Sequence, residues 1–370
     1  IIKKNMYAEL VEKTIEFWLY IKAENIFFPS SIDADNVDGE GGYYLFKKPQ
    51  ILENLNKKEI EYCQLNFSMT DKSLKENKWH MHKKETISSV FEENLLSKLK
   101  DLRTANLFPA VDTKAICSWN CMMIMGLIDA SITYQNSKWF EIAETTTHLI
   151  LNNFCNEDLC YRLVYSNKII TGTLEDYSWL VALFIKIGHI STSAYWFNES
   201  IKWTNIIINK FWAEDKNLFA FTESEVLYKK SFEIEDQVIP SSNSVIANNL
   251  YELYNVTHDK KYLEIMDKMM RKVGSKAQKW LPNYTNWMML SNKKKSSNKL
   301  YVTIGYELNE LWNLHHQKEI NDQVYVLEKE SEILIFKEKY QEEEKNIFIC
   351  NENSCIANTA NIKEALSIKI

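Results

Sequence analysis

Residues 115–130 read A-I-C-S-W-N-C-M-M-I-M-G-L-I-D-A, and the fold prediction starts from this stretch. Larger and small apolar residues recur in it at the spacing of one helical face: Trp119, Met122, Met123, Gly126, Leu127 and Ala130. We therefore expect a helix that buries this face. Ser118 or Thr113 would cap its start. Trp119 and Asn120 would then lie in the first turn, at the end of a barrel.

The neighbouring sequence repeats this pattern with a shift of 57 residues, which places F-C-N-E-D-L-C-Y-R-L on F-W-A-E-D-K-N-L-F-A-F. The paired positions are Trp139 with Trp196, Phe154 with Phe211, Glu157 with Glu214, and Asp158 with Asp215. A looser third copy covers residues 242–254 and 259–273, and a partial fourth covers residues 7–22. A repeat of two helices and a short hairpin predicts an (α/α) toroid, in which inner helices line an axis and outer helices wrap them.

The other segments fit around this toroid. Residues 85–103 are typical of an acid-rich helix, residues 293–299 of a solvated surface loop, and residues 302–315 of a further inner helix. Residues 323–327, 330–344 and 346–350 follow as strand, helix and strand. The predicted fold is all-α dominated, with a toroid domain over residues 1–320 and a small α/β appendage over residues 321–370.

The composition and net charge limit the classes of partner and the cellular compartment that we expect. The chain has 370 residues, is 45% hydrophobic and carries a net charge of −6, which argues against nucleic acid as a partner. No apolar run reaches the length of a membrane span, so we expect no membrane partner. No motif calls for a cofactor or a metal. The seven cysteines are odd in number and lack metal spacing, which favours a reducing, cytoplasmic compartment. Cys350 and Cys355 could pair, bind a metal, or merely be neighbours in a loop.

The first stretch that could carry chemistry is residues 30–44, S-S-I-D-A-D-N-V-D-G-E-G-G-Y-Y. Its carboxylates include Asp33 and Asp35, among three glycines. Glycosyl chemistry needs paired acids, one protonated and one ionised. The alternatives are a calcium-binding run without the register of an EF-hand, and an acidic surface loop.

The second stretch is residues 171–179, T-G-T-L-E-D-Y-S-W. Thr173 and Asp176 approximate a capping box, which would explain one acid as a helix cap. That interpretation does not require Glu175 and Tyr177 beside it. We therefore predict Glu175 and Asp176 as a second acid cluster that lines the cavity.

Two further stretches precede expected inner helices. Residues 110–120 offer Asp112 and Lys114 as an opposite-charge pair, followed by the Trp119 and Asn120 side chains. Residues 239–244 read I-P-S-S-N-S, where Ser242 or Asn243 would cap the helix. We expect sugar-orienting contacts from one set of residues: Asp112, Trp119, Asn120, Tyr177, Ser241 and Asn243. Ordinary loop charges and helix caps are the alternative.

The seven histidines are scattered over loops and outer faces, where core or solvent roles are the expectation. The sequence contains no Gly-rich phosphate loop, no G-x-S-x-G elbow and no H-E-x-x-H. Phosphoryl transfer, serine hydrolase and zinc peptidase chemistry are therefore not indicated.

The order of these motifs resembles one family. S-I-D-A-D…G-E-G-G-Y-Y, P-A-V-D-T-K-A-I-C-S-W-N, G-T-L-E-D-Y, I-P-S-S-N-S-V and C-N-E-N-S-C follow the pattern of the YyaL-like proteins, whose animal members are called spermatogenesis-associated protein 20. The resemblance implies a six-hairpin glycosidase-like toroid, related to glycoside hydrolases and sugar epimerases, and an N-terminal thioredoxin-like domain. This chain lacks the thioredoxin-like region and any C-x-x-C motif. It also shows about four hairpins instead of six, so we expect an incomplete, N-terminally truncated toroid.

The resulting hypothesis is a carbohydrate-directed protein, of glycosidase or epimerase type, that binds a small sugar. Asp33 and Asp35 would form one acid cluster, and Glu175 and Asp176 the other, across the cavity. The alternative is a non-catalytic interaction module that partners a thioredoxin-like domain. In that case the acids would be helix caps and loop residues.

Overall fold

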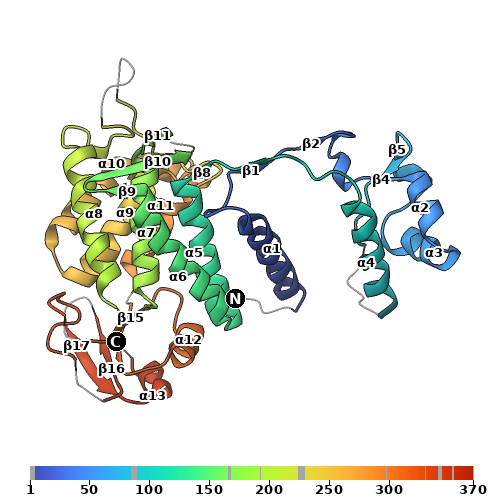
Figure 1. Ribbon diagram of the computed structural model, residues 1–370. Coiled ribbons are helices and arrows are strands. Elements are labelled where there is room, and N and C mark those ends of the chain that lie inside the picture. The colour runs from blue at the N-terminus through green and yellow to red at the C-terminus, as the bar shows by residue number, and fades with distance from the viewer. Residues whose placement is uncertain are drawn as a thin grey trace. The chain divides into compact units, whose positions relative to one another are not determined.

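The computed structural model describes residues 5–84, 90–165, 168–191, 193–223, 230–296, 298–329, 331–340, 344–351 and 354–369. The chain divides into two compact units, Ile1–Thr113 and Lys114–Ile370. Figure 1 shows the helices and strands of each unit.

Three helical hairpins form the first part of the second unit (Figure 1). The inner helices are α5 (Cys117–Tyr134), α7 (Leu174–Gly188) and α9 (Ser242–Thr257), and the outer helices are α6 (Ser137–Phe154), α8 (Tyr195–Phe211) and α10 (Lys260–Lys279). Helix α7 contacts both α5 and α9, and each inner helix packs against the outer helix that follows it. This is the predicted (α/α) arrangement, so the all-α-dominated fold class is confirmed.

Burial separates the inner from the outer helices. Almost every residue of α7 is buried, and Leu180, Leu183 and Phe184 are 0% exposed. A helix that is apolar all round must be covered on all sides. Outer helix α8 instead buries one face, which carries Trp196 and Trp203.

Helix α5 forms where the sequence predicts it, but the prediction of which of its faces is buried is wrong. The predicted face begins at Trp119, which is 44% exposed. The observed face runs through Cys117, Cys121, Ile124 and Ile128, all 0% exposed. Both faces have helical spacing, and the packing against α6 and α7 selects the one with cysteine and β-branched residues. The predicted caps are also wrong, because the N-cap is Ile116 without a side-chain hydrogen bond.

The 57-residue repeat is confirmed in the second unit. Helices α6 and α8 end at Phe154 and Phe211, and each runs directly into a two-residue strand, β9 (Cys155–Asn156) or β12 (Trp212–Ala213). Helices α9 and α10 match the looser third copy. The fourth copy corresponds to α1 (Asn5–Ala23), which belongs to the first unit.

Short strands connect the starts of the helices. Strand β10 (Leu159–Tyr165) pairs with β9, with β11 (Lys168–Thr171) and with β8 (Ala115–Ile116), the strand directly before α5. Strand β12 pairs with β13 (Leu218–Phe219). Because β8 and β10 are paired, the beginning of α5 is held close to the residues that follow α6.

A four-stranded sheet follows the hairpins. Its strands are β14 (Leu300–Ile304), β15 (Gln323–Leu327), β16 (Asn346–Cys350) and β17 (Cys355–Thr359), in the order β15-β14-β16-β17. Strands β14 and β15 are parallel and are joined through α12 (Leu308–Gln317), and α13 (Ile362–Ser367) follows β17. The small α/β element is thus present. Since the sheet includes β14, it extends to both sides of residue 320, and the division at that residue stays a prediction.

Two predicted helices in this region are wrong. Residues 300–304 form strand β14, all five of them buried, so the helix predicted over residues 302–315 is only α12. Gly305 ends β14 with a φ of 72°, and a Cβ there would lie 2.7 Å from the carbonyl oxygen of Glu344. Described residues 331–340 form turns, where the sequence predicted a helix.

Helix α11 (Thr285–Lys295) follows η3 (Leu281–Tyr284) and contacts α9 and α10. Its last turn contains Lys293, which the sequence placed in a solvated loop. The Lys293 side chain is only 22% exposed and pairs with Glu252. That prediction is wrong because the lysine run ends a helix that packs on the inner helix α9.

Cys350 and Cys355 form a disulfide that joins β16 to β17. Of the outcomes left open by the sequence, pairing is the observed one. Five cysteines are free: Cys63, Cys117, Cys121, Cys155 and Cys160. Among the described helices, none is both long and apolar enough to cross a membrane.

The first unit has its own small core. Its elements after α1 are β1 (Ser31–Ile32), β2 (Asp35–Asn36), β3 (Gly39–Glu40), η1 (Gly42–Tyr44), β4 (Phe46–Lys47), α2 (Lys48–Asn54), α3 (Lys57–Asn66), η2 (Asp71–Ser73), β5 (Leu74–Lys75), β6 (Lys78–Trp79), α4 (Val90–Thr104) and β7 (Val111–Asp112). Ile51, Cys63 and Leu95 are at most 1% exposed and pack in one cluster. Helix α4 is the described part of the helix predicted over residues 85–103, and residues 85–89 lie outside the described residues.

Candidate functional site

Polar side chains meet where α5 and α7 begin. Ser118 stands in the first turn of α5, Arg162 in β10, and Glu175 and Asp176 in the first turn of α7. The Ser118 Oγ donates to Glu175 Oε1 at 2.6 Å, and the Ser118 N–H donates to Asp176 Oδ1 at 3.3 Å. Arg162 Nη1 lies 3.4 Å from Glu175 Oε1 and 3.2 Å from Asp176 Oδ2. We call these four residues the acid cluster.

Asp176 is the structural member of the acid cluster. It is 0% exposed, and its Oδ2 accepts from the Thr173 N–H at 3.0 Å and from the Thr173 hydroxyl at 3.2 Å. The predicted cap is therefore present. Burial raises the pKa of Asp176, although Arg162 and the backbone donors of Thr173 and Ser118 act against this rise. With both oxygens engaged, Asp176 orients Arg162 and fixes the start of α7.

Glu175 is the member better suited to chemistry. Its Oε1 is held by Ser118 and Arg162, while its side chain keeps 12% exposure. A carboxylate that is oriented through one oxygen can bind a hydroxyl, or exchange a proton, through the other. Arg162 is 31% exposed and could also donate to an incoming ligand.

The aromatic and amide residues that we predicted to contact a sugar differ in their exposure to solvent. Trp119 is exposed in the first turn of α5, where its ring is available for stacking. Asn120 is 1% exposed, and its Nδ2 donates to the Ile116 carbonyl at 3.0 Å. Tyr177 is also 1% exposed, and its hydroxyl accepts from the Cys160 N–H at 2.9 Å. Of these three predicted contacts, only Trp119 faces solvent.

The two residues at the start of α9 that we predicted to contact a sugar form hydrogen bonds with backbone groups instead. Asn243 accepts from the Phe219 N–H and donates to the Phe219 carbonyl, both at 2.9 Å, so it fastens β13 to α9. Ser241 is the N-cap of α9 and accepts from the Ser244 N–H at 3.3 Å. The predicted caps Ser242 and Asn243 are thus wrong by one or two positions.

Two acids before α9 were missed by the sequence analysis. Glu233 accepts from the N–H of Ser242 at 3.1 Å. Asp236 accepts from the N–H of Ser241 at 2.9 Å and from the N–H of Asn286 at 2.8 Å. The run E-I-E-D at residues 233–236, just before the predicted helix, was the available signal.

Asp33, Asp35 and Asp112 belong to the first unit. Asp33 Oδ1 accepts from the Asp35 N–H at 3.1 Å, and both residues are exposed. The Asp112 carbonyl accepts from the Ser30 N–H at 3.1 Å, beside the pairing of β1 with β7. Asp33 and Asp35 thus lie together as predicted, and their pairing with Glu175 and Asp176 stays a prediction.

The first unit also has an open cavity of about 320 Å³. Its lining residues come from β4, α2 and the β5–β6 turn: Lys47, Pro49, Gln50, Glu53, Asn54, Glu76, Asn77 and Lys78. None of the predicted site residues lines this cavity.

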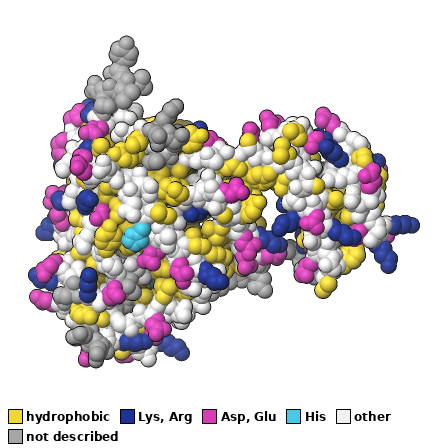
Figure 2. Space-filling model, viewed as in Figure 1, with side chains coloured by type: hydrophobic (Ala, Val, Ile, Leu, Met, Phe, Trp, Pro, Cys, Tyr) yellow, Lys and Arg dark blue, Asp and Glu magenta, His cyan; other side chains and the backbone are white. Residues whose placement is uncertain are grey.

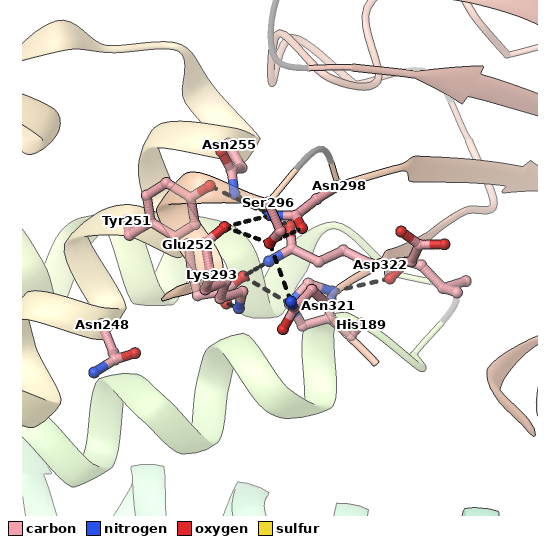
Figure 3. Close-up of polar contacts among 12 residues, drawn as sticks. His189, Asn248, Tyr251, Glu252, Asn255, Lys293, Ser296, Asn298, Asn321 and Asp322 are labelled. Atoms are coloured by element: carbon pink, nitrogen blue, oxygen red, sulfur yellow. Dashed lines mark hydrogen bonds and ion pairs between the residues drawn. The ribbon is translucent and has the colours of Figure 1, made fainter. Parts of the chain in front are cut away.

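A second polar cluster lies where α7, α9 and α11 meet β15 (Figure 3). At its centre Glu252 accepts from Lys293 and from Gln323, and its Oε2 lies 3.5 Å from His189 Nε2. The other ring nitrogen of His189 lies 2.9 Å from the Val324 carbonyl oxygen. Burial alone would raise the pKa of Glu252, but Lys293 and His189 outweigh it and lower the pKa to about 2. This cluster ties the helical hairpins to the sheet.

Among the described residues, no group of three or more His, Cys, Asp or Glu side chains is arranged to hold a metal ion. On the face shown in Figure 2, acidic and basic side chains are interspersed. The candidate site is therefore the acid cluster, together with the exposed Trp119, which follows Ser118 in the first turn of α5. Arg162 and Ser118 were missed as site residues, because their roles depend on contacts with Glu175 and Asp176.

No family model matches the chain. An uncharacterised Caenorhabditis elegans protein, B0495.5, is 22% identical over 182 residues, which cover 47% of this chain and 25% of that protein. Human spermatogenesis-associated protein 20 is 22% identical over 183 residues (46% of this chain, 23% of that protein), and the rat protein is 24% identical over the same length. The resemblance found in the sequence is confirmed. The chain is a distant relative of these proteins and matches about a quarter of their length.

Two solved structures are also similar. A GH76 α-mannanase from Bacteroides thetaiotaomicron has a TM-score of 0.42 and 13% identity, over 78% of this chain and 94% of the mannanase. Cellobiose 2-epimerase from Bacillus thermoamylovorans has a TM-score of 0.37 and 10% identity, over 74% and 73% of the two chains.

Proposed function

We propose that the chain is a carbohydrate-directed protein whose sugar site is the acid cluster together with Trp119. The observation that carries this proposal is the 2.6 Å hydrogen bond from Ser118 to Glu175 Oε1, with Arg162 on the same oxygen. It fixes the orientation of a carboxylate whose side chain keeps 12% exposure. The exposed indole of Trp119 adds a surface on which a sugar ring can stack.

Glycosidase-like or epimerase-like chemistry would use Glu175 as the proton-transferring group. Asp176 would keep Arg162 in place, and Arg162 would hold Glu175. Hydrolysis with two carboxylates requires a second acid about 5–10 Å away. The assignment of Asp33 and Asp35 to that second acid stays a prediction from the sequence.

A thermal-shift screen against mono- and disaccharides tests the proposal. We expect at least one sugar to raise the Tm of the wild type, because a ligand that binds only the folded state stabilises it. Glu175→Gln should abolish the rise, whereas Glu141→Gln, at an exposed position of α6, should retain it. Trp119→Ala should weaken it, and Trp280→Ala, which removes an indole that is 69% exposed, should not.

The second candidate function is a non-catalytic module that binds a thioredoxin-like domain. It is favoured by the internal hydrogen bonds of Asp176, Tyr177 and Asn243, which act as structural groups. A flat sugar panel with well-folded wild type and variants would refute the sugar site. Binding of a thioredoxin-like domain in the same preparation would then establish the module.

We place the protein in the cytoplasm, with no nucleic acid or membrane as partner. Five of the seven cysteines are free and four of these are buried, which supports a reducing compartment, and the Cys350–Cys355 disulfide is the exception. The net charge of −6 disfavours binding to phosphate backbones. Fractionation of cells that express the full chain tests this placement, and recovery in a membrane or secreted fraction would contradict it.

A further inference from the structure

The chain contains the pattern C-N-E-x-x-C twice, at residues 155–160 and 350–355. In both copies the two cysteines are opposite each other on the antiparallel strands of a tight hairpin, β9–β10 and β16–β17. The residues just inside the cysteines also face each other. Asn156 is paired with Leu159, and the Asn351 N–H donates to the Ser354 carbonyl at 2.9 Å.

The two hairpins differ in their sulfur chemistry. Cys350 and Cys355 form a disulfide, whereas Cys155 and Cys160 are free thiols. Directly opposite residues of an antiparallel pair have Cα atoms about 4.5–5.5 Å apart, which falls within the range that a disulfide accepts. Residues 155–160 therefore have the spacing and the pairing that are already closed in residues 350–355.

The solvent exposure of the cysteines favours the same pair, Cys155 and Cys160. Cys155 is partly exposed, while Cys160 is 0% exposed and lies behind it. A reagent can thus reach Cys155 first, and Cys160 is the thiol placed to react next. Cys117 is the competing partner, because its Sγ lies 3.8 Å from Cys160 Sγ, but both of these residues are 0% exposed.

We propose that Cys155 and Cys160 are a redox-active dithiol that exchanges with an external disulfide. The Cys155 thiolate attacks one sulfur of the external disulfide, so that a mixed disulfide forms and one thiol leaves. Cys160 then gives up its proton and attacks Cys155 Sγ, and the second thiol leaves with that proton. The external disulfide is reduced to two thiols while the hairpin gains one disulfide.

The hairpin lies next to the acid cluster, since Cys160 is two residues before Arg162 in β10 and its N–H binds Tyr177 of α7. Closure would also commit the Cys160 sulfur that now contacts Cys117 at the start of α5. The proposal does not depend on the sugar site.

The test is oxidation of the full chain by glutathione disulfide, followed by alkylation and a non-reducing peptide map. Before oxidation, alkylation in denaturant should label the five free cysteines, and after oxidation three. The map should show a Cys155–Cys160 link beside the existing Cys350–Cys355 link. Oxidation that leaves all five cysteines open to alkylation would overturn the proposal.

Matched variants identify the pair. Cys155→Ser should prevent the second disulfide, whereas Cys63→Ser, which removes a buried thiol of the first unit, should not. Cys117→Ser should also retain it. A Cys117–Cys160 link in the wild type, or loss of the new disulfide in Cys117→Ser, would overturn the assignment. The wild-type map decides the question even if a variant does not fold.

Discussion

Glu252 provides the sharpest test of how the hairpins are held to the sheet. Its carboxylate pairs with Lys293 and faces His189, and its side chain is 15% exposed. Its pKa falls from 4.5 to about 2 in the folded protein. Each unit of pKa shift corresponds to about 1.4 kcal/mol, so the ionised form contributes about 3 kcal/mol to folding.

The sign of the pH dependence follows from the lowered pKa. Above pH 4.5 the carboxylate is ionised in both states, and the full contribution is present. As the pH falls from 4.5 towards 2, the unfolded chain binds the proton first, and the contribution is lost. Glu252→Gln removes the charge and leaves the partly buried Lys293 without its partner, which has a similar cost.

Urea unfolding at several pH values measures this effect. We expect Glu252→Gln to lower the free energy of unfolding by about 3 kcal/mol at pH 7, and this deficit to shrink as the pH falls below 4.5. The control is Glu264→Gln, at an exposed position of α10, which should change it by less than about 0.5 kcal/mol. A loss below about 1 kcal/mol at pH 7, or a deficit that is constant with pH, would contradict a stabilising role for the ionised Glu252 carboxylate.

Three further predictions use the same unfolding assay. Asp176→Ala removes a helix cap and a partner of Arg162, and should cost about 2–4 kcal/mol; a cost under about 0.5 kcal/mol would contradict the structural role. Gly188→Ala places a Cβ 3.1 Å from a buried phenylalanine ring and should destabilise by about 1–3 kcal/mol, whereas Gly126→Ala meets open space within a helix and should stabilise by about 0.5–1 kcal/mol. Burial lowers the pKa of His315 from 6.5 to about 3, so the free energy of unfolding decreases as the pH falls below 6.5. His315→Gln should reduce the slope of this decrease by about 1.4 kcal/mol per pH unit. An unchanged slope of the unfolding free energy against pH would contradict this prediction.

The helical hairpins could be predicted because their information is local. The apolar period of each helix and the 57-residue shift are both visible in the sequence, and the helix ends at Phe154 and Phe211 follow the shift. Strand β14 could not be predicted in this way. Its sequence L-Y-V-T-I is a short apolar run, which suits a buried strand and a buried helix equally. Its pairing with residues far along the chain decides between the two.

The candidate site could be predicted only in part, because only some of its contacts are local in the sequence. The cap formed by Asp176 is local, because it binds a backbone three residues away. Arg162 reaches Glu175 and Asp176 from β10, and Lys293 reaches Glu252 across 41 residues. Ion pairs of this kind depend on which elements pack together, and a lysine in a polar run is most often solvated.

The repeat of the helical hairpins explains why the ionisable side chain at this level, Glu175, belongs to α7. Ser118, Glu175 and Asn243 are each the second residue of an inner helix, so neighbouring inner helices present them at the same level. Asn243 holds β13 through its hydrogen bonds to Phe219, and the Ser118 hydroxyl donates a hydrogen bond to Glu175. Glu175 is the one of these three equivalent residues that carries a charge. Under the proposed function, a proton-transferring role at this level of the hairpins would therefore fall to Glu175, which Ser118 orients through its hydrogen bond.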